Sequence, residues 1–190
     1  MIYRNWTISE AAWTRRGTVA TRLAAKQFPR WLLEAPVWCH FWTKHGVDAK
    51  LNVQHALTLR RLLGFLIVAF WYGWNDEMFD TAYPKYTASP RFRSNVQAMQ
   101  AAGIRVVPYI NGRMYDPSTG GADVAATHAC HSMPSASDPQ LRPYREVYHP
   151  APQNISFIVM DPSQTWWQQT LVNVSSTLVR EYGVNGIYID

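Results

Sequence analysis

Cysteine is scarce in this sequence: among 190 residues there are two, Cys39 and Cys130. They lie far apart and neither belongs to a Cys-x-x-Cys pair, which excludes a disulfide framework and a paired-cysteine redox motif. The segment from His128 to His131 places Cys130 between two histidines, but its spacing matches none of the usual zinc patterns. We predict that this segment belongs to a polar loop. The sequence implies no metal and no organic cofactor.

Long hydrophobic runs are also missing. The longest one, residues 62–74, is interrupted by two glycines and is too short to span a bilayer. Residues 1–30 contain no continuous apolar stretch of the kind found in signal peptides, and they are rich in Arg with Glu10 as their one acidic residue. We therefore expect no membrane partner. We interpret residues 1–30 as an N-terminal extension or the remnant of an upstream domain, and residues 31–190 as a separate unit.

Acidic residues are outnumbered, with 13 Asp and Glu against 18 Lys and Arg, for a formal net charge of +5. The basic excess lies before residue 62, but it is not part of a recognisable nucleic-acid-binding module. No Gly-x-Gly-x-x-Gly or Gly-x-x-x-x-Gly-Lys-Ser/Thr segment follows any predicted strand, so a nucleotide-binding fold loses its main support. We expect no nucleic-acid partner.

Aromatic side chains, in contrast, are abundant, with nine Trp and ten Tyr in a sequence that is 47% hydrophobic. One interpretation is a well-filled hydrophobic core. The other is a set of flat platforms on which sugar rings or bases stack.

Strand-like and helix-like segments alternate along residues 31–190. Apolar and β-branched residues predict strands at 35–42, 65–72, 104–110 and 183–190, the last of them buried. Helices are predicted from Asn52 to Gly64, from Ser89 to Gly103, and from a capping box at Asp161 to Gly183. Residues 114–153 are rich in Ser, Pro, Gly and Asp and are predicted to form a long loop without regular structure, followed by a short extended piece at 155–160.

This alternation predicts an α/β fold in which the strands pair in parallel through right-handed crossovers. The second strand is apolar on both faces, which is typical of a parallel sheet covered on both sides. We predict the N-terminal half of a (β/α)8 TIM barrel, with about four parallel strands and three intervening helices, apparently truncated. Such a half barrel leaves its outer strands as unpaired edges that favour association with other chains.

The reactive groups of such barrels lie at the carboxyl ends of the strands. The residues that follow the predicted strands are aromatic, amide-bearing or charged, a combination that suits sugar rings and their hydroxyls. They are Trp42, Trp74, Asn75, Asp76, Asn111, Arg113 and Asp190. Glycoside hydrolysis usually requires two carboxyl groups beside the bond that is cleaved. Asp190, at the end of a rigid strand, is the candidate for one of them.

At this point the series resembles the catalytic barrel of the α-galactosidase-like glycoside hydrolases of clan D. The resemblance is carried by the order of five segments: Pro36 to Trp42, Trp71 to Pro84, Gly103 to Tyr109, the helix start at Asp161, and Gly183 to Asp190. It implies a carbohydrate substrate and the role of catalytic nucleophile for Asp190. Two positions depart from the pattern of the α-galactosidases, since Tyr188 stands where they usually have Lys, and Asn75-Asp76 where they commonly have paired Asp. The resemblance therefore does not extend to galactose specificity.

The chain is also similar to a glycoside-hydrolase-like barrel family catalogued as a domain of unknown function. Here the shared segments are Trp-Tyr-x-Trp, Phe-Asp-Thr-x-Tyr-Pro and Pro-Tyr-Ile-Asn-Gly, which begin at Trp71, Phe79 and Pro108. This resemblance covers about Trp31 to Asp190.

The leading hypothesis is a glycoside hydrolase with Asp190 as nucleophile and Trp42, Trp74, Asp76 and Asn111 as the residues that shape the sugar site. The acid/base carboxylate would come from a later strand, so we expect these 190 residues alone to be inactive. The alternative is a non-catalytic carbohydrate-binding protein or a degenerate barrel. The three polar residues also have a structural interpretation: Asp190 as a helix N-cap, Asp76 as a solvated turn residue, and Asn111 as part of the turn at Gly112.

Overall fold

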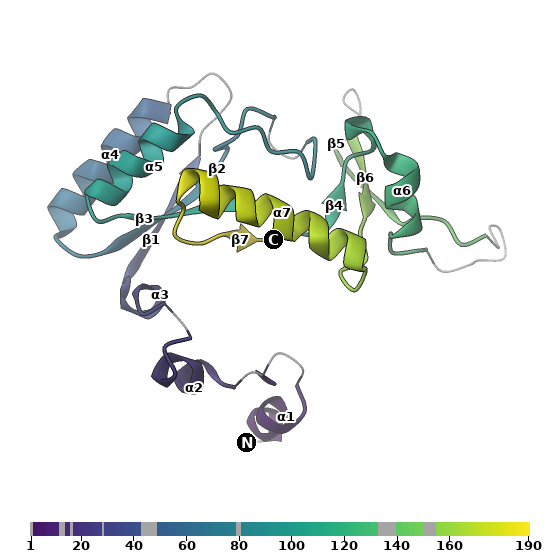
Figure 1. The fold of residues 1–190 in the computed structure, drawn as a ribbon, viewed down its shortest axis with the longest axis horizontal. Coiled ribbons are helices and arrows are strands. Elements are labelled where there is room, and N and C mark those ends of the chain that lie inside the picture. Colours follow the sequence, from purple (N-terminus) through teal and green to yellow (C-terminus); the bar gives the residue numbers. More distant parts are fainter. Residues whose placement is uncertain are drawn as a thin grey trace.

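The computed structural model describes residues 2–11, 14–15, 17–27, 29–42, 49–78, 81–132, 140–149 and 155–190. Its main sheet has four strands in the order β1-β2-β3-β7, and every neighbouring pair is parallel. The strands are β1 (Val37–Trp42), β2 (Ile67–Tyr72), β3 (Arg105–Ile110) and β7 (Tyr188–Ile189). The helices between them are α4 (Ala49–Leu63), α5 (Phe92–Ala101) and α7 (Thr165–Tyr182). The predicted α/β fold with four parallel strands is confirmed (Figure 1).

One face of this sheet forms the main hydrophobic core. Ile67, Ala69 and Trp71 of β2 are fully buried on it, together with Val96 of α5 and Leu178 of α7. Fully burying a Val, Leu or Ile side chain stabilises the fold by about 1.5–3 kcal/mol. Apolar residues occur at every second position of the strands and at helical spacing on α5 and α7, so the apolar sides of these elements face one another in the core.

The predicted end of α7 is confirmed, whereas its predicted start is wrong. Gly183 closes the helix in the left-handed conformation (φ 70°), which only glycine adopts easily. At the other end, Asp161 is not the N-cap, because the helix begins at Thr165 and Gln164 occupies the N-cap position. The Asp161 carboxylate accepts hydrogen bonds from the backbone and hydroxyl of Ser163, at 2.8 and 2.7 Å. These bonds close a separate turn before the helix begins at Thr165, and they lower the pKa of Asp161.

The prediction of a long loop without regular structure is also wrong. Between β3 and α7 the chain forms β4 (Met114–Tyr115), η2 (Pro117–Thr119), α6 (Ala122–Thr127), β5 (Arg145–His149) and β6 (Ile155–Val159). These three strands make an antiparallel sheet in the order β4-β6-β5. Residues 133–139 and 150–154 of the predicted loop lie outside the described residues. The short extended piece predicted near 155–160 is confirmed as β6.

Each face of this second sheet packs against a different part of the molecule. Tyr115 and Ile158 face the buried Trp167 of α7 and Ala125 of α6. Phe157 and Val159 face the opposite way and pack with Tyr109 of β3. In Figure 1 the second sheet stands beyond the carboxyl ends of β3 and β7. The main sheet and the second sheet thus meet where the sequence predicts the reactive groups.

The segment before β1 contains three short helices, α1 (Ile2–Ser9), α2 (Val19–Ala24) and α3 (Trp31–Glu34). Figure 1 shows α1 and α2 away from both sheets, while α3 adjoins the start of β1. Trp31 packs against the buried Val68 and Val107, so α3 covers the amino end of the main sheet. Among the residues that the structure describes, no helix has the length and apolar character needed to cross a membrane.

The last strand, β7, is exposed rather than buried as predicted. Tyr188 and Ile189 are 41% and 52% exposed. Within the described residues β7 pairs with β3 on one side and has no neighbour on the other. Its backbone is nevertheless held firmly, because Gly112 lets it come close to the end of β3. A Cβ atom at Gly112 would lie 2.4 Å from Cγ2 of Ile189 and 3.2 Å from the Asp190 carbonyl oxygen.

We predict that Gly112→Ala displaces the end of β7 and lowers the free energy of unfolding by about 1–3 kcal/mol, the usual cost of overpacking. Urea unfolding followed by Trp fluorescence measures the change. The matched control is Gly186→Ala, where the nearest atom to the added Cβ is 3.5 Å away, an ordinary contact. Equal stability of the two variants would contradict the proposed close approach.

A second buried contact ties the loop after β2 to the second sheet. Asp116 is 7% exposed, and its two carboxylate oxygens accept hydrogen bonds from the backbone of Ala82 (2.7 Å) and Ser118 (2.9 Å). Its own N–H donates to the Tyr83 carbonyl at 2.8 Å. One carboxylate therefore satisfies backbone donors of two segments that are remote in sequence.

Asp116→Ala is expected to lower the free energy of unfolding by about 1–2 kcal/mol, because it removes a buried acceptor of two part-buried N–H groups. Asp123→Ala, in the exposed first turn of α6, is the control and should change stability by less than about 0.5 kcal/mol. Thermal or urea unfolding of both variants checks the difference. If Asp116→Ala were as stable as the control, the carboxylate would not hold the loop.

Candidate functional site

The face of the main sheet opposite the helices carries a row of aromatic rings near the carboxyl ends of the strands. The row, called here the aromatic tract, consists of Trp42, Tyr72, Tyr109 and Tyr188. Trp42 stacks on Tyr72 with ring centres 5.6 Å apart, and Tyr72 stacks on Tyr109 at 4.1 Å. Tyr109 and Tyr188 follow at 6.1 Å. The four rings run across all four strands, one from each.

The tract is accessible at both of its ends. Trp42 is 44% exposed, and Tyr188 is 41% exposed, whereas Tyr109 in the middle is buried. Rings that are apolar on their faces and polar at their tips suit a ligand that is itself apolar on one face and hydroxylated at its rim, such as a sugar. Of the residues predicted to shape a sugar site, Trp42 thus has an exposed ring.

Asp190 lies at the carboxyl end of this face. Its N–H donates to the Ile110 carbonyl at 3.1 Å, and its carbonyl accepts from the Gly112 N–H at 2.8 Å. These bonds continue the parallel pairing of β3 and β7 by one residue. Since side chains alternate along a strand, Asp190 leaves the backbone on the same side as Tyr188. The structure thus places an exposed carboxylate at the rim of the aromatic tract.

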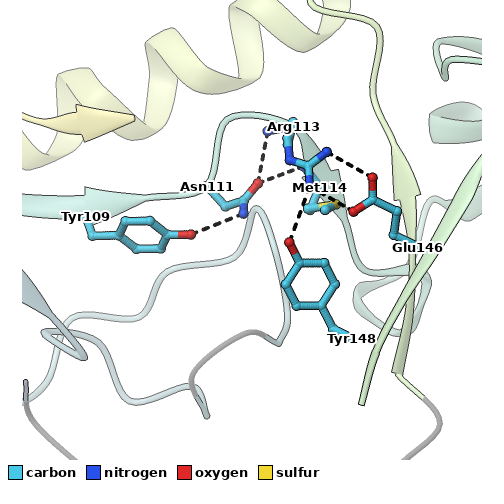
Figure 2. Close-up of polar contacts among 6 residues, drawn as sticks. All are labelled: Tyr109, Asn111, Arg113, Met114, Glu146 and Tyr148. Carbon is cyan, nitrogen blue, oxygen red and sulfur yellow. Dashed lines mark hydrogen bonds and ion pairs between the residues drawn. The ribbon is translucent and has the colours of Figure 1, made fainter. Parts of the chain in front are cut away.

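Asn111 is buried and its side chain is used within the protein. Its Oδ1 accepts hydrogen bonds from the backbone of Arg113 (3.0 Å) and Met114 (2.8 Å), and its Nδ2 donates to the Tyr109 hydroxyl at 3.2 Å (Figure 2). These contacts fix the turn that follows β3 and orient one ring of the tract. These contacts agree with the interpretation of Asn111 as part of the turn at Gly112. Its amide is buried and does not lie on the surface of the site.

Trp74 does not occupy an exposed position. It is 2% exposed, and its ring packs with Tyr86 and Phe92 in the main core. Its indole N–H donates to the Tyr109 carbonyl at 2.7 Å. The side chain of a residue just past a strand end can point to either face of the sheet. The Trp74 ring points to the face covered by α5, where it packs on Phe92 and where the Tyr109 carbonyl accepts its N–H. Trp74 supports the tract from behind and presents no face to a ligand.

Asp76 lies on the exposed loop after β2. Its backbone N–H donates to the Thr87 carbonyl at 2.8 Å, which ties the two arms of this loop together. Beside it, Glu77 accepts hydrogen bonds from Asn75 Nδ2 (3.0 Å) and from the Thr87 N–H (2.9 Å). Partial burial acts to raise the pKa of Glu77, but these hydrogen bonds outweigh it and lower that pKa. Glu77 thus braces the loop, while Asp76 points its carboxylate outward.

A charged cluster, called here the Arg113 cluster, joins the turn after β3 to the second sheet. Arg113 donates two hydrogen bonds to the carboxylate of Glu146, at 3.0 and 2.8 Å, and a third to the Tyr148 hydroxyl at 3.3 Å (Figure 2). Hydrogen bonding to Glu146, and then to Tyr148, raises the pKa of Arg113. The guanidinium is therefore a permanent positive charge at the mouth of the site.

The sequence singled out Arg113 but not Glu146 or Tyr148. Both belong to a segment that was predicted to lack regular structure. A local signal was present, because residues 145–149 contain Val and Tyr, which favour a strand. In the parts of the chain that the structure describes, no group of three or more His, Cys, Asp or Glu is arranged to hold a metal ion.

Comparison with curated proteins finds two relatives of low but extended similarity. The chain is 29% identical over 212 aligned positions to "Putative glycoside hydrolase 22789" of Monosiga brevicollis, with 100% of this chain and 17% of that protein covered. It is 25% identical over 202 positions to "Putative glycoside hydrolase" of Bacteroides thetaiotaomicron, with 98% and 27% covered. The chain thus spans less than a third of the length of each relative.

Among solved structures, the fold is similar to that of the ligand-free alpha-N-acetylgalactosaminidase NagBb from Bifidobacterium bifidum. The TM-score is 0.73 with 15% identity, and the match covers 100% of this chain and 33% of the other. A cycloisomaltooligosaccharide glucanotransferase from Paenibacillus sp. matches with a TM-score of 0.60, 12% identity, and 84% and 24% coverage. At such identities these matches concern the fold alone.

A family match extends over the complete chain, residues 1–190, and so includes the segment before β1. It agrees with the glycoside-hydrolase-like family that the sequence resembles, and with the names of the curated relatives. The chain belongs to the family described as Domain of unknown function (DUF6259).

Proposed function

We propose that this chain forms the first part of a glycoside hydrolase barrel and that Asp190 is its catalytic nucleophile. One observation carries the proposal: the parallel sheet ends at an exposed carboxylate beside a row of aromatic rings. Relatives named as glycoside hydrolases support the class of reaction. Four parallel strands with helices on one face are what the first half of an eight-stranded barrel requires.

In the proposed reaction, the Asp190 carboxylate attacks the anomeric carbon of a bound sugar and forms a glycosyl ester. The bond to the leaving oxygen breaks as a carboxylic acid from another part of the full-length protein protonates that oxygen. Water, deprotonated by the same carboxyl group, then attacks the anomeric carbon and releases Asp190. The two hydrogen bonds to the Asp190 backbone favour this role, because a nucleophile acts best when it is held in place before the substrate binds.

The aromatic tract is the proposed platform for the sugar. Trp42 offers an exposed ring that is held parallel to Tyr72, so that little side-chain freedom is lost when a ligand stacks on it. Asp76, an exposed residue of the loop after β2, is a further candidate partner for sugar hydroxyl groups. Asn111 and Trp74 act indirectly, by positioning Tyr109.

The first substrates to test are α-linked, because two similar structures are named as an alpha-N-acetylgalactosaminidase and an alpha-galactosidase. The p-nitrophenyl α-glycosides of N-acetylgalactosamine, galactose and glucose form a suitable panel for the full-length protein. A protein that binds these sugars without releasing p-nitrophenol would instead fit the alternative, a non-catalytic carbohydrate-binding barrel.

Asp190→Asn is expected to lower kcat on the active member of this panel by about 1,000-fold or more, as removal of an enzyme nucleophile does. Asp123→Asn on α6 makes the same chemical change at an exposed carboxylate away from the tract and should leave kcat unchanged.

Azide distinguishes a nucleophile from a residue that only supports the fold. In Asp190→Gly, azide can occupy the vacated space and attack the anomeric carbon, which yields a glycosyl azide that mass spectrometry detects. Recovery of turnover by azide in this variant supports the role of Asp190. Full activity of Asp190→Asn would exclude it.

Trp42→Ala is expected to raise KM about 10- to 100-fold with a smaller effect on kcat, because it removes a stacking surface for the sugar that is present before and during reaction. Trp42→Phe, which keeps a ring, should recover part of the loss. The initial-rate kinetics of the two variants check this. If KM stays unchanged in Trp42→Ala, the sugar does not stack on the tract at this ring.

A further inference from the structure

The second sheet turns one of its faces toward the aromatic tract. Phe157 and Val159 on this face pack with Tyr109 of the tract. Directly opposed residues of an antiparallel pair share a face, and Glu146 lies opposite Phe157. The side chain of Glu146 therefore leaves the second sheet on the side of the tract.

The Arg113 cluster occupies this face at its exposed margin. The side chain of Arg113 is 46% exposed and that of Glu146 is 25% exposed, although the two form a bidentate ion pair. Tyr148 is 40% exposed, and its ring is held at 76° against the buried Phe157. These side chains are thus fixed by one another and still reach solvent.

The cluster keeps hydrogen-bonding capacity for a ligand. Within the described residues, Arg113 uses three of the five N–H groups of its guanidinium in its bonds to Glu146 and Tyr148. Because the Tyr148 hydroxyl accepts its bond from Arg113, its own proton remains available for donation. Each oxygen of Glu146 accepts one bond from Arg113 and has a further lone pair. Donors and acceptors that alternate over a short distance match vicinal sugar hydroxyls.

Position decides which sugar could reach these groups. The Asp190 carbonyl accepts a hydrogen bond from the N–H of Gly112, the residue directly before Arg113. The turn that carries Arg113 therefore adjoins the main chain of Asp190 and leads to the second sheet, whereas the tract extends from β7 across β3, β2 and β1. A sugar stacked on the tract would direct its neighbouring unit toward this turn.

We propose that Arg113, Glu146 and Tyr148 form a binding subsite for the sugar on the leaving side of the cleaved bond. The inference rests on the proposed function, since it assumes that Asp190 attacks the sugar bound on the tract. The class of ligand is a neutral sugar unit that presents two adjacent hydroxyls to the ion pair. Tyr148 adds a ring edge and one hydroxyl donor.

The test compares two substrates of the full-length protein that share the transferred sugar. In α-N-acetylgalactosaminyl fluoride the leaving group is a fluoride ion, whereas in α-N-acetylgalactosaminyl-(1→3)-galactose the leaving group is galactose. Arg113→Met and Tyr148→Phe should each lower kcat/KM for the disaccharide about 10- to 100-fold, mainly by raising KM. The kcat/KM for the fluoride should stay within about twofold of the wild-type value. Inhibition of fluoride hydrolysis by free galactose should weaken in parallel.

Two further variants separate ligand binding from a purely structural role. Arg113→Glu combined with Glu146→Arg restores an ion pair but exchanges the groups that a ligand meets. Recovery of disaccharide turnover by this exchange would overturn the subsite and show a structural clamp instead. Arg61→Met, on an exposed position of α4, is the matched control and should behave as the wild type.

Failure of the subsite and failure of the proposed function give different results. If Asp190→Asn loses activity on both substrates while Arg113→Met affects neither or both equally, Asp190 acts as proposed and the subsite is wrong. If the wild type turns over neither substrate, the proposed activity fails for this sugar, and calorimetric titration with the disaccharide still tests the subsite. Binding that weakens in Tyr148→Phe supports it, and equal or absent binding overturns it.

Discussion

Two main-chain hydrogen bonds hold the carboxyl edge of the parallel sheet together, one from Asp190 to Ile110 and one from Gly112 to Asp190. They extend the pairing of β3 and β7 into the turn that carries the polar groups of the site. The absence of a side chain at Gly112 makes this approach possible. Because both bonds join main-chain atoms, they fix the position of Asp190 without using its side-chain carboxylate.

The turn after β3 links three parts of the molecule. Asn111 satisfies the N–H groups of this turn and orients Tyr109 of the aromatic tract. Trp167 of α7 donates its indole N–H to the Gly112 carbonyl at 2.7 Å, so the outer helix also contacts the turn. Arg113, in the same turn, donates two hydrogen bonds to Glu146 of the second sheet. A shift of this turn would therefore move the strand end, the tract and the second sheet together, which makes it the structural centre of the site.

A good part of this arrangement follows from local sequence. Alternating apolar strands and amphipathic helices predicted the α/β fold, the strand order in the chain and the strand ends at which Trp42 and Asp190 stand. The departures occur where local signals conflict. Asp161 and Pro162 resemble a helix start, but the Asp161 carboxylate closes its own turn first. The segment rich in Ser and Pro after β3 reads as a loop, yet its strand β4 pairs with the distant β6, and β5 pairs with the other edge of β6.

The sequence by itself determined which residues lie in the strands of the main sheet and which come at their carboxyl ends, because the apolar pattern of these strands is visible locally. Only the tertiary structure decided what each end residue does. Trp74 turned inward because the Tyr109 carbonyl, remote in sequence, accepts its N–H, and Asn111 was taken up by the turn. Glu146 and Tyr148 came to Arg113 because β6 pairs with β4, far from it in the chain, on one side and with β5 on the other. Such contacts depend on residues far apart in the chain, which no local pattern records.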